Sequence, residues 1–509
     1  MESGRQPEEK FKEDYRIMRL IEIGLVLFNV LLMGLLTLGR PKSQRGWLIS
    51  SGISAVLLLV HAFVEGLRWP MIPVYLITLW AIAGGARLFL RSAARPSSKP
   101  RRRWKTVLLG GVAAVYAAVT IALPLLFPVF SFAELTGPYA IGTATYHWTD
   151  SAREEKFTEA SGDSRELMVQ IWYPASPKAT GKAAPYLSDP APYVEGLHEL
   201  LQLPKFLFSG LKQVNTHAIA NARLADTESK YPVLLFSHGF MGYKNQNTFQ
   251  VEQLASHGYI VVGIEHAYSS VVSVFPDQHV VKFDSEGKTG YEQMKYSFMD
   301  GRNQVWVEDA KFVLDQIEAL SANDPDDLFT GRIDLEHMGM FGHSFGGATT
   351  VQMLLDDSRI QAGIDMDGVL YGEKRIPADG LKKPFLLMSA DDTIKGVDHT
   401  GDVEIAALGT DREEIAAYYD ELFARYEPVT AGGNYWMTFK HSKHMSFSDL
   451  YLLTPLFEWM EGVDVRGTHE LINEYTLDFF DHFLKGQPLQ YLDRNLGDHP
   501  EYTLQQGAE

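Results

Sequence analysis

Long apolar runs fill roughly the first quarter of the chain, and short apolar runs alternate with polar stretches after it. Four early runs are long enough to cross a bilayer as helices, which takes about 20 residues, and short charged loops separate them. They are roughly Leu20–Gly39, Trp47–Val64, Pro70–Leu90 and Thr106–Phe130. This pattern predicts an all-α transmembrane helical bundle of about four helices over residues 1–130. The chain would then be a multi-pass cell-membrane protein.

The loop charges predict how this bundle is oriented. The loop from Arg91 to Lys105 carries seven Lys and Arg residues, and the loop after the first run carries Arg40, Lys42 and Arg45. Basic loops stay in the cytoplasm. With four spans, the N-terminus and the larger C-terminal part both face outward, so we expect the catalytic domain on the extracytoplasmic side. The first run is the weakest span, because Glu22 and Asn29 lie inside it.

Charge separates the two parts of the chain. Residues 1–130 hold 17 basic and 7 acidic side chains, a balance of +10 within a chain of net charge −18. The remaining residues therefore carry −28. Such an acidic domain repels phosphate, which argues against nucleic-acid binding. The chain has no cysteine, so disulfides, thiolate metal sites and a cysteine nucleophile are excluded.

Residues 131–509 have the pattern of an α/β domain. Short β-rich runs alternate with helical stretches such as Val305–Leu320, which is typical of a mainly parallel sheet with helices on both faces. The segment Ser270–Met299 is less regular and is a candidate lid or entrance loop. The candidate strands are residues 143–148, 167–173, 233–239, 259–266, 338–344, 362–368, 384–390 and 435–441.

The strongest chemical signal is the sequence Gly342-His343-Ser344-Phe345-Gly346, which has the form G-x-S-x-G. It follows a candidate strand and precedes a helical stretch. That context is typical of a nucleophile elbow, the sharp turn that exposes a serine oxygen in the α/β-hydrolase fold. Ser344 is therefore the candidate nucleophile.

A serine nucleophile needs a histidine base, and the base needs an orienting carboxylate. His441 and His444 follow the last candidate strand, and we expect His444 to be the base. Two acidic pairs follow the strands after the elbow, Asp365 with Asp367 and Asp391 with Asp392. Both pairs end adjacent parallel strands at the same edge of the sheet, so a carboxylate from either could reach the imidazole. The local sequence favours Asp367, which ends an apolar run.

Backbone N–H groups must bind the oxyanion that forms during acyl transfer. The residue after the nucleophile, Phe345, supplies one such group, and Phe240 in the turn after strand 233–239 is the candidate for the other. His238 and His266 could suggest a metal site, but no ligand spacing supports one. We therefore predict no metal and no cofactor.

Four segments, taken in this order, resemble the platelet-activating factor acetylhydrolase family, of the plasma and intracellular type II kind. They are residues 234–266, 302–320, 342–350 and 363–368, within a resemblance over roughly Gly137–Leu484. The resemblance implies Ser344 as nucleophile, Asp367 as acid, His444 as base, and Phe240 and Phe345 as oxyanion donors. The N-terminal bundle departs from the animal enzymes and indicates a bacterial, membrane-anchored form.

The resemblance implies calcium-independent hydrolysis of a short or oxidised acyl ester, with phospholipids among the substrates. The expected partners are an ester or phospholipid substrate and the lipid bilayer. Two alternatives stay open from the sequence. One is a general carboxylesterase acting on small or cell-wall esters, and the other is a membrane sensor whose hydrolase domain only binds a ligand.

Overall fold

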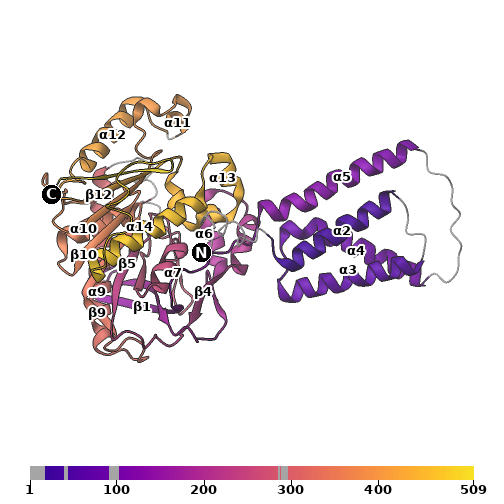
Figure 1. Cartoon of the computed structure of the whole chain (residues 1–509), viewed down its shortest axis with the longest axis horizontal. Coiled ribbons are helices and arrows are strands. Elements are labelled where there is room, and N and C mark those ends of the chain that lie inside the picture. The colour runs from indigo at the N-terminus through magenta and orange to yellow at the C-terminus, as the bar shows by residue number, and fades with distance from the viewer. Residues whose placement is uncertain are drawn as a thin grey trace, which may run out of the picture. The chain divides into compact units, whose positions relative to one another are not determined.

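The structure is a computed structural model that describes residues 18–38, 44–90, 103–284, 287, 296–407 and 409–508. It divides into two compact units (Figure 1). One unit contains the N-terminal helices together with residues 204–214 and 453–456. The other contains residues 132–203, 215–452 and 457–509. Most of the basic loop at 91–105, and part of the one at 40–45, lie outside the described residues.

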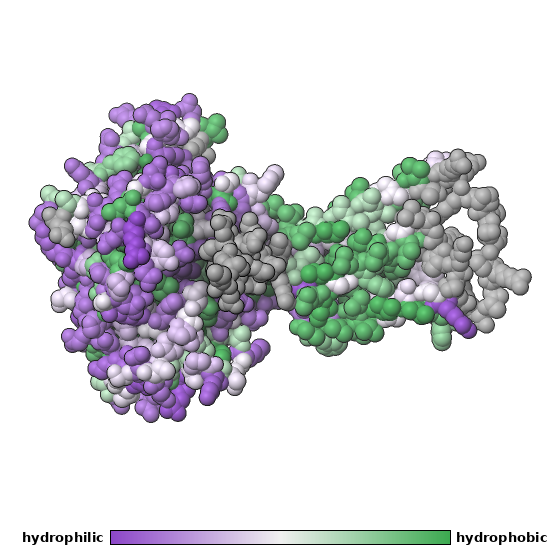
Figure 2. All heavy atoms as spheres, viewed as in Figure 1, coloured by the Kyte–Doolittle hydropathy of each residue, from purple (hydrophilic) through white to green (hydrophobic). Residues whose placement is uncertain are grey.

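The N-terminal helices present apolar side chains outward. Large residues such as Phe63, Val107 and Leu31 are 85%, 75% and 67% exposed, and Figure 2 shows the helices as an almost continuous apolar surface. A water-soluble helix would bury such a face. The helices are α2 Leu20–Leu38, α3 Gln44–Val64, η1 Trp69–Met71, α4 Ile72–Leu90 and α5 Arg103–Leu126.

Three of these helices are long and apolar enough to cross a membrane, over Arg45–Val64, Trp69–Arg87 and Val107–Leu126. The apolar part of α2, Leu20–Leu35, is shorter. The polar residue inside it, Asn29, is fully buried and donates to the Leu25 carbonyl at 2.7 Å. The side-chain amide of Asn29 therefore keeps a hydrogen-bond partner although it is buried in an apolar helix.

Charged side chains join three helices at one end of the bundle. Arg68 donates to both carboxylate oxygens of Glu22, at 2.6 and 2.7 Å, and also to the carbonyl of Phe127, the residue after α5. Glu65, after α3, accepts from the backbone N–H of Ile21 and of Glu22 in the first turn of α2. The pairing explains how Glu22 can be buried in an apolar helix.

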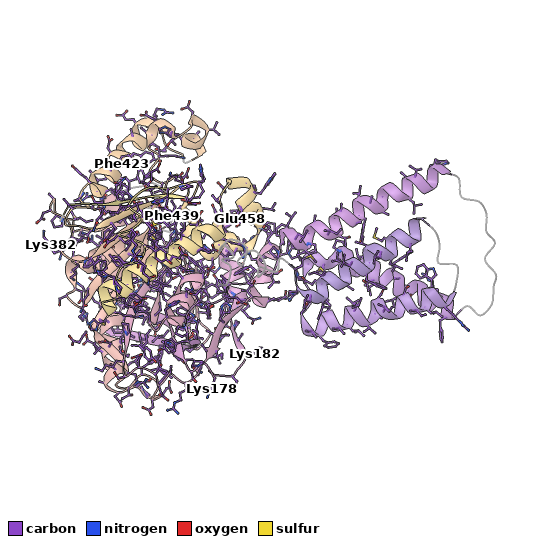
Figure 3. The ribbon with its side chains drawn as sticks, in the orientation of Figure 1. Lys178, Lys182, Lys382, Phe423, Phe439 and Glu458 are labelled. Carbon is purple, nitrogen blue, oxygen red and sulfur yellow. The ribbon has the colours of Figure 1, made fainter. Side chains whose placement is uncertain are left out.

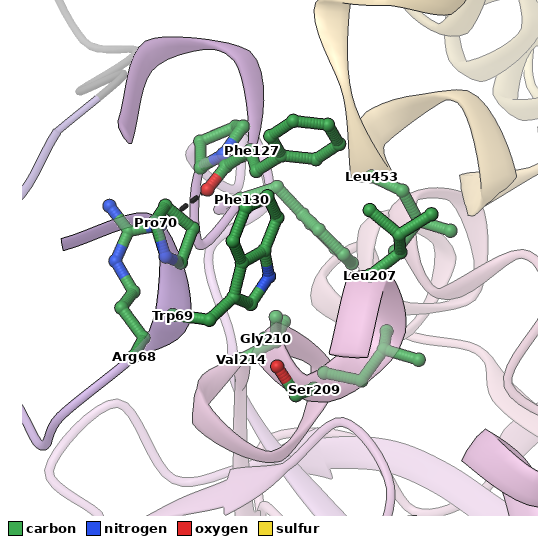
Figure 4. Close-up of a pocket in the computed structure, with 12 residues that line it drawn as sticks. Arg68, Trp69, Pro70, Phe127, Phe130, Leu207, Ser209, Gly210, Val214 and Leu453 are labelled. Carbon is green, nitrogen blue, oxygen red and sulfur yellow. Dashed lines mark hydrogen bonds between the residues drawn. The ribbon is translucent and has the colours of Figure 1, made fainter. Parts of the chain in front are cut away.

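Short segments from the later chain belong to the same unit as the bundle. The helix η2, Lys205–Gln213, places Phe206 against the ring of Trp69, with centroids 4.8 Å apart. Thr454 donates to the carbonyl of Leu126 at 2.5 Å. Figure 4 shows the cavity that these segments enclose with Arg68; its volume is about 20 Å³, room for about one water molecule. It is too small for a substrate.

The second unit is built on one twelve-stranded sheet, with a central parallel part from β6 through β12. Its strands are β1 Ala140–Glu154, β2 Ser164–Ala175, β3 Ala183–Pro185, β4 Asn215–Ala220, β5 Tyr231–Ser237, β6 Ile260–Glu265, β9 Ile333–His343, β10 Ile360–Met366, β11 Phe385–Ala390, β12 Tyr435–Phe439, β13 Gly497–Asp498 and β14 Tyr502–Gln506. Their order is β13-β14-β12-β11-β10-β9-β5-β6-β2-β1-β4-β3. At one side of the sheet β14 pairs antiparallel with β12 and β13. At the other side β2 pairs antiparallel with β6 and β1, β1 pairs parallel with β4, and β3 pairs antiparallel with β4.

Helices cover both faces of the sheet, so the central strands are buried on both sides. Every residue of β5 and of β6 is buried, as expected for apolar runs in a parallel sheet. The helices are α6 Pro190–Leu201, α7 Thr248–Ser256, α9 Tyr296–Ala322, α10 Phe345–Asp356, α11 Asp402–Ala407, α12 Arg412–Tyr426, α13 Pro455–Glu461 and α14 Val465–Lys485. Figure 3 labels Phe439, which is 1% exposed, and three exposed lysines, Lys178, Lys182 and Lys382.

The predicted α/β pattern is confirmed, since each of the eight candidate strands overlaps an observed strand. The candidate lid Ser270–Met299 contains a small hairpin, β7 Val272–Val274 with β8 Val280–Lys282, and the start of α9. Residues 285, 286 and 288–295 of that segment lie outside the described residues.

Candidate active site

The G-x-S-x-G sequence forms a strand-to-helix turn. The strand β9 ends at His343, α10 begins at Phe345, and Ser344 between them has φ 56° and ψ −119°. This conformation is strained for a residue with a side chain. The flanking glycines make it possible: a Cβ on Gly342 would lie 2.2 Å from the carbonyl carbon of Gly346, and a Cβ on Gly346 would lie 2.0 Å from the backbone carbonyl oxygen of Ser237.

The structure brings Ser344, His444 and Asp367 together from three separate loops. The Oγ of Ser344 lies 2.9 Å from Nε2 of His444, and Nδ1 of His444 lies 2.6 Å from Oδ2 of Asp367. Because a carboxylate only accepts, Nδ1 carries the proton and Nε2 presents its lone pair to the serine hydroxyl. This is the arrangement that a general base requires.

Asp367 is held firmly behind the imidazole. It follows β10, is fully buried, and has φ 60°. Its Oδ1 accepts from the backbone N–H of Ala390 at 2.7 Å, and its Oδ2 accepts from the Thr393 hydroxyl at 2.7 Å. These contacts fix the carboxylate at the position where it faces His444.

The other aspartates contact different groups. Asp391 accepts from the backbone N–H of His441 at 2.7 Å and of Ser442 at 3.1 Å, so it braces the loop that leads to His444. Asp392 pairs with Lys443 at 2.8 Å. Burial alone would raise the pKa of Asp392, but its hydrogen bond to Lys443 and the charges of Lys395 and Lys443 bring that pKa below its usual value.

Asp365 lies in β10, two residues before Asp367, and contacts the turn that follows the strand. It is fully buried, and its Oδ1 accepts from the backbone N–H of Gly368 at 2.7 Å. Burial holds the pKa of this carboxyl well above its ordinary value, with the nearby charge of Asp367 adding to the shift. Asp365 therefore supports the turn that carries Asp367.

The predicted oxyanion residues lie side by side. The rings of Phe240 and Phe345 are 5.2 Å apart, and a Cβ on Gly239 would lie 3.2 Å from the Ser344 Cβ. The turn containing Phe240 thus passes next to Ser344. Phe345 opens α10, and the first N–H groups of a helix have no partner within it.

His238 and His266 belong to a buried hydrogen-bond network behind that turn. His266 contacts Ser237 Oγ through Nε2 at 3.0 Å and Asp309 through Nδ1 at 2.9 Å. Burial lowers the pKa of both histidines. The Ser237–His266–Asp309 set repeats the connections of the candidate site, in which Ser344 and His444 are partly exposed, but all three of its side chains are fully buried and out of reach of a substrate. The sequence analysis missed it, because Asp309 lies in the middle of a helix with no motif around it.

Within the described parts of the chain, one group of side chains lies close enough together to hold a metal ion. It consists of Glu22, His61 and Glu65 in the N-terminal unit. Arg68 already pairs with both oxygens of Glu22, and Glu65 accepts from His61 at 3.0 Å. These partners compensate the carboxylates, so the group is better explained as a structural ion-pair cluster.

The second unit belongs to the α/β-hydrolase-like class. It has that class's mainly parallel sheet, its strand-to-helix turn, and loops at the carboxyl edge of the sheet that carry the candidate residues. A solved structure, ferulic acid esterase from Streptomyces cinnamoneus, superposes with a TM-score of 0.57 at 27% sequence identity. The alignment covers 74% of this chain and 98% of that one.

Within that class the chain belongs to the family described as platelet-activating factor acetylhydrolase, isoform II, whose model matches residues 127–487. This finding confirms the resemblance inferred from the sequence. The platelet-activating factor acetylhydrolase of Cavia porcellus is 30% identical over 315 residues, which is 57% of this chain and 67% of the relative. That of Bos taurus is 31% identical over 193 residues, 35% of this chain and less than half (43%) of the relative.

Proposed function

We propose that this chain hydrolyses carboxylic esters, with Ser344 as the nucleophile. The observation that supports this most directly is the pair of contacts from Ser344 Oγ to His444 and from His444 to Asp367, at 2.9 and 2.6 Å. The named relatives are acetylhydrolases, and the structural neighbour is an esterase. Both are carboxylic ester hydrolases.

The reaction proceeds in two steps. His444 takes the proton of Ser344 as its oxygen attacks the acyl carbonyl, and Asp367 stabilises the imidazolium. The backbone N–H groups of Phe240 and Phe345 bind the developing oxyanion. His444 then gives the proton to the leaving alcohol. Water, deprotonated by His444, cleaves the acyl-enzyme and restores the serine. The scheme uses no metal and no cofactor.

For the substrate we propose short or oxidised acyl esters, including those of phospholipids. The names of the relatives support the acetyl group. Bulky side chains also crowd Phe345, one of the two proposed oxyanion donors. The ring centroid of Trp306 lies 4.8 Å from that of Phe345, and the ring centroid of Tyr371 lies 5.8 Å from it. A small acyl group fits such surroundings better than a long chain.

Short acyl esters should therefore be hydrolysed faster than long ones. We expect kcat/KM to fall by about tenfold or more between butyryl and lauryl p-nitrophenyl esters, because a restricted apolar site rejects added methylenes. The same series should be run on phosphatidylcholines graded in the sn-2 chain. Equal or better turnover of long-chain phospholipids would point to a general phospholipase. Cleavage of small soluble esters alone would favour a general carboxylesterase.

We further propose that the N-terminal helices anchor the enzyme in the membrane and that the hydrolase domain lies on the extracytoplasmic side. The exposed apolar helices support the anchor, and the basic loops at 40–45 and 91–105 support the orientation. An anchored hydrolase reaches lipid esters without leaving the bilayer surface.

Protease added to right-side-out spheroplasts should digest the hydrolase domain, detected with an antibody against the C-terminus. Inside-out vesicles should protect it, and a cytoplasmic marker protein in the spheroplasts should stay intact. The opposite pattern, with digestion only in inside-out vesicles, would reverse the orientation. Recovery of the full chain in the soluble fraction would contradict the anchor itself.

A further inference from the structure

Two buried side chains that the reaction scheme does not use lie between the loops of the candidate site. Gln246 is 4% exposed and precedes α7, and His343 is 1% exposed and directly precedes Ser344. Neither side chain takes part in the proton transfers proposed above. Their hydrogen bonds run to all three loops that hold the nucleophile, the base and the oxyanion donor.

Gln246 anchors the turn that contains Phe240. Its Oε1 accepts from the backbone N–H of Gly239 at 3.1 Å, while the N–H of Met241 donates to the Ser269 carbonyl at 2.9 Å. The amides on both sides of Phe240 are thus tied down. The approach is so close that a Cβ on Gly242 would lie 2.0 Å from Oε1 of Gln246. A side chain at that position would therefore displace Gln246.

The same amide reaches the nucleophile turn. Nε2 of Gln246 lies 2.6 Å from Nδ1 of His343, and Nε2 of His343 lies 2.9 Å from the backbone carbonyl of His444. Since Oε1 accepts from Gly239, the amide nitrogen must donate to His343. The proton of His343 is then on Nε2, where it donates to His444. One chain of hydrogen bonds thereby connects the oxyanion turn, the nucleophile turn and the loop of the base.

His343 must stay uncharged for this chain to work. Its ring lies 4.6 Å from the ring of His444, which becomes positive during the reaction. Burial, reinforced by the charge of His444, holds the pKa of His343 well below its ordinary value. A neutral His343 can hold the loop of His444 without opposing the charge that forms there.

We propose that Gln246 and His343 are positioning residues that hold the oxyanion turn, the nucleophile and the base in register for ester hydrolysis. The inference rests on the proposed function, since it concerns the same site. Neither residue touches the reacting atoms. Their effect is on the alignment of groups that stabilise the transition state, so it should appear in kcat and not in KM.

The test compares purified full-length variants in detergent, with p-nitrophenyl acetate as substrate. Gln246→Leu and His343→Leu should each lower kcat by about 10–100-fold with KM changed by less than about threefold, because small misalignments at a reacting centre are costly. The kcat of the double variant should lie within about threefold of that of the less active single variant, because both substitutions break the same chain of hydrogen bonds.

A conservative variant and a matched control separate positioning from folding. His343→Gln keeps an acceptor for Gln246 and a donor for the His444 carbonyl, so it should restore kcat to within about fivefold of the parent. Gln250→Leu removes a buried glutamine from α7, the helix that Gln246 precedes; the Nε2 of Gln250 donates to Thr476 at 3.0 Å, away from the site. It should lower Tm and leave kcat within about twofold.

Several outcomes would overturn the inference. They are a kcat within about twofold of the parent in both leucine variants, fully additive losses, or an equal loss of kcat in Gln250→Leu. If the leucine variants lose their melting transition, the comparison of Gln246→Glu with His343→Gln decides. The carboxylate cannot donate to His343, so only Gln246→Glu should lose kcat. A parent enzyme whose activity survives Ser344→Ala would refute the proposed function instead.

Discussion

Ser344→Ala should abolish ester hydrolysis, with kcat/KM lower by on the order of 10⁴–10⁶. The substitution removes one oxygen atom, which is the atom that His444 Nε2 contacts at 2.9 Å. Alanine fits where serine does, so the fold should persist. The measurement is kcat/KM on p-nitrophenyl acetate, with Tm as the control for folding. A folded variant with activity within about tenfold of the parent would place the nucleophile elsewhere.

Asp367→Asn should lower kcat by on the order of 10³–10⁴, as loss of the orienting carboxylate does in other triads. An asparagine amide can donate to Nδ1 of His444, which favours the tautomer with its proton on Nε2, facing Ser344. The imidazole then presents no lone pair to the nucleophile. The assay is steady-state kinetics at saturating substrate.

The neighbouring aspartates provide matched controls for that result. Asp391→Asn removes a brace of the His441–Ser442 backbone and should cost less than about tenfold. Asp392→Asn breaks a partly exposed pair with Lys443 and should cost less than about twofold. The reverse ranking, with Asp367→Asn close to the parent, would move the acid to the later strand.

The fold could be predicted far into the hydrolase unit because its central strands are continuous apolar runs. Both faces of such strands are buried, so β5 and β6 stand out in the sequence without any knowledge of their partners. The antiparallel strand β14, which lies between β12 and the edge strand β13, was not predicted. Its sequence, YTLQQ, is short and half polar, and its pairing with β12 depends on tertiary structure.

The site was predictable where the chemistry lies in a local motif. The elbow around Ser344 has a sequence of its own, and His444 follows a clear strand. The acid was harder to predict, since Asp367 and Asp391 end adjacent parallel strands and only the apolar run before Asp367 and the family resemblance favoured it. What distinguishes them is the direction of each side chain: Asp367 faces the imidazole, and Asp391 faces backbone N–H groups.

The supporting contacts could not be read from the sequence at all. Gln246 and His343 are 97 residues apart, and His343 meets the His444 carbonyl over 101 residues. A buried glutamine beside a helix has no pattern that marks it. Likewise, the grouping of residues 204–214 with the N-terminal helices depends on packing that no local periodicity encodes.

If the chain works as an enzyme and not as a ligand sensor, Ser344 is an activated nucleophile. A fluorophosphonate reacts only with such a serine, so the most direct measurement is the intact mass of the labelled protein, followed by peptide mapping. We expect a single adduct on Ser344, which is lost in Ser344→Ala and formed much more slowly in His444→Ala. No adduct on the folded protein, or an adduct on another residue that persists in Ser344→Ala, would show that Ser344 is not the nucleophile.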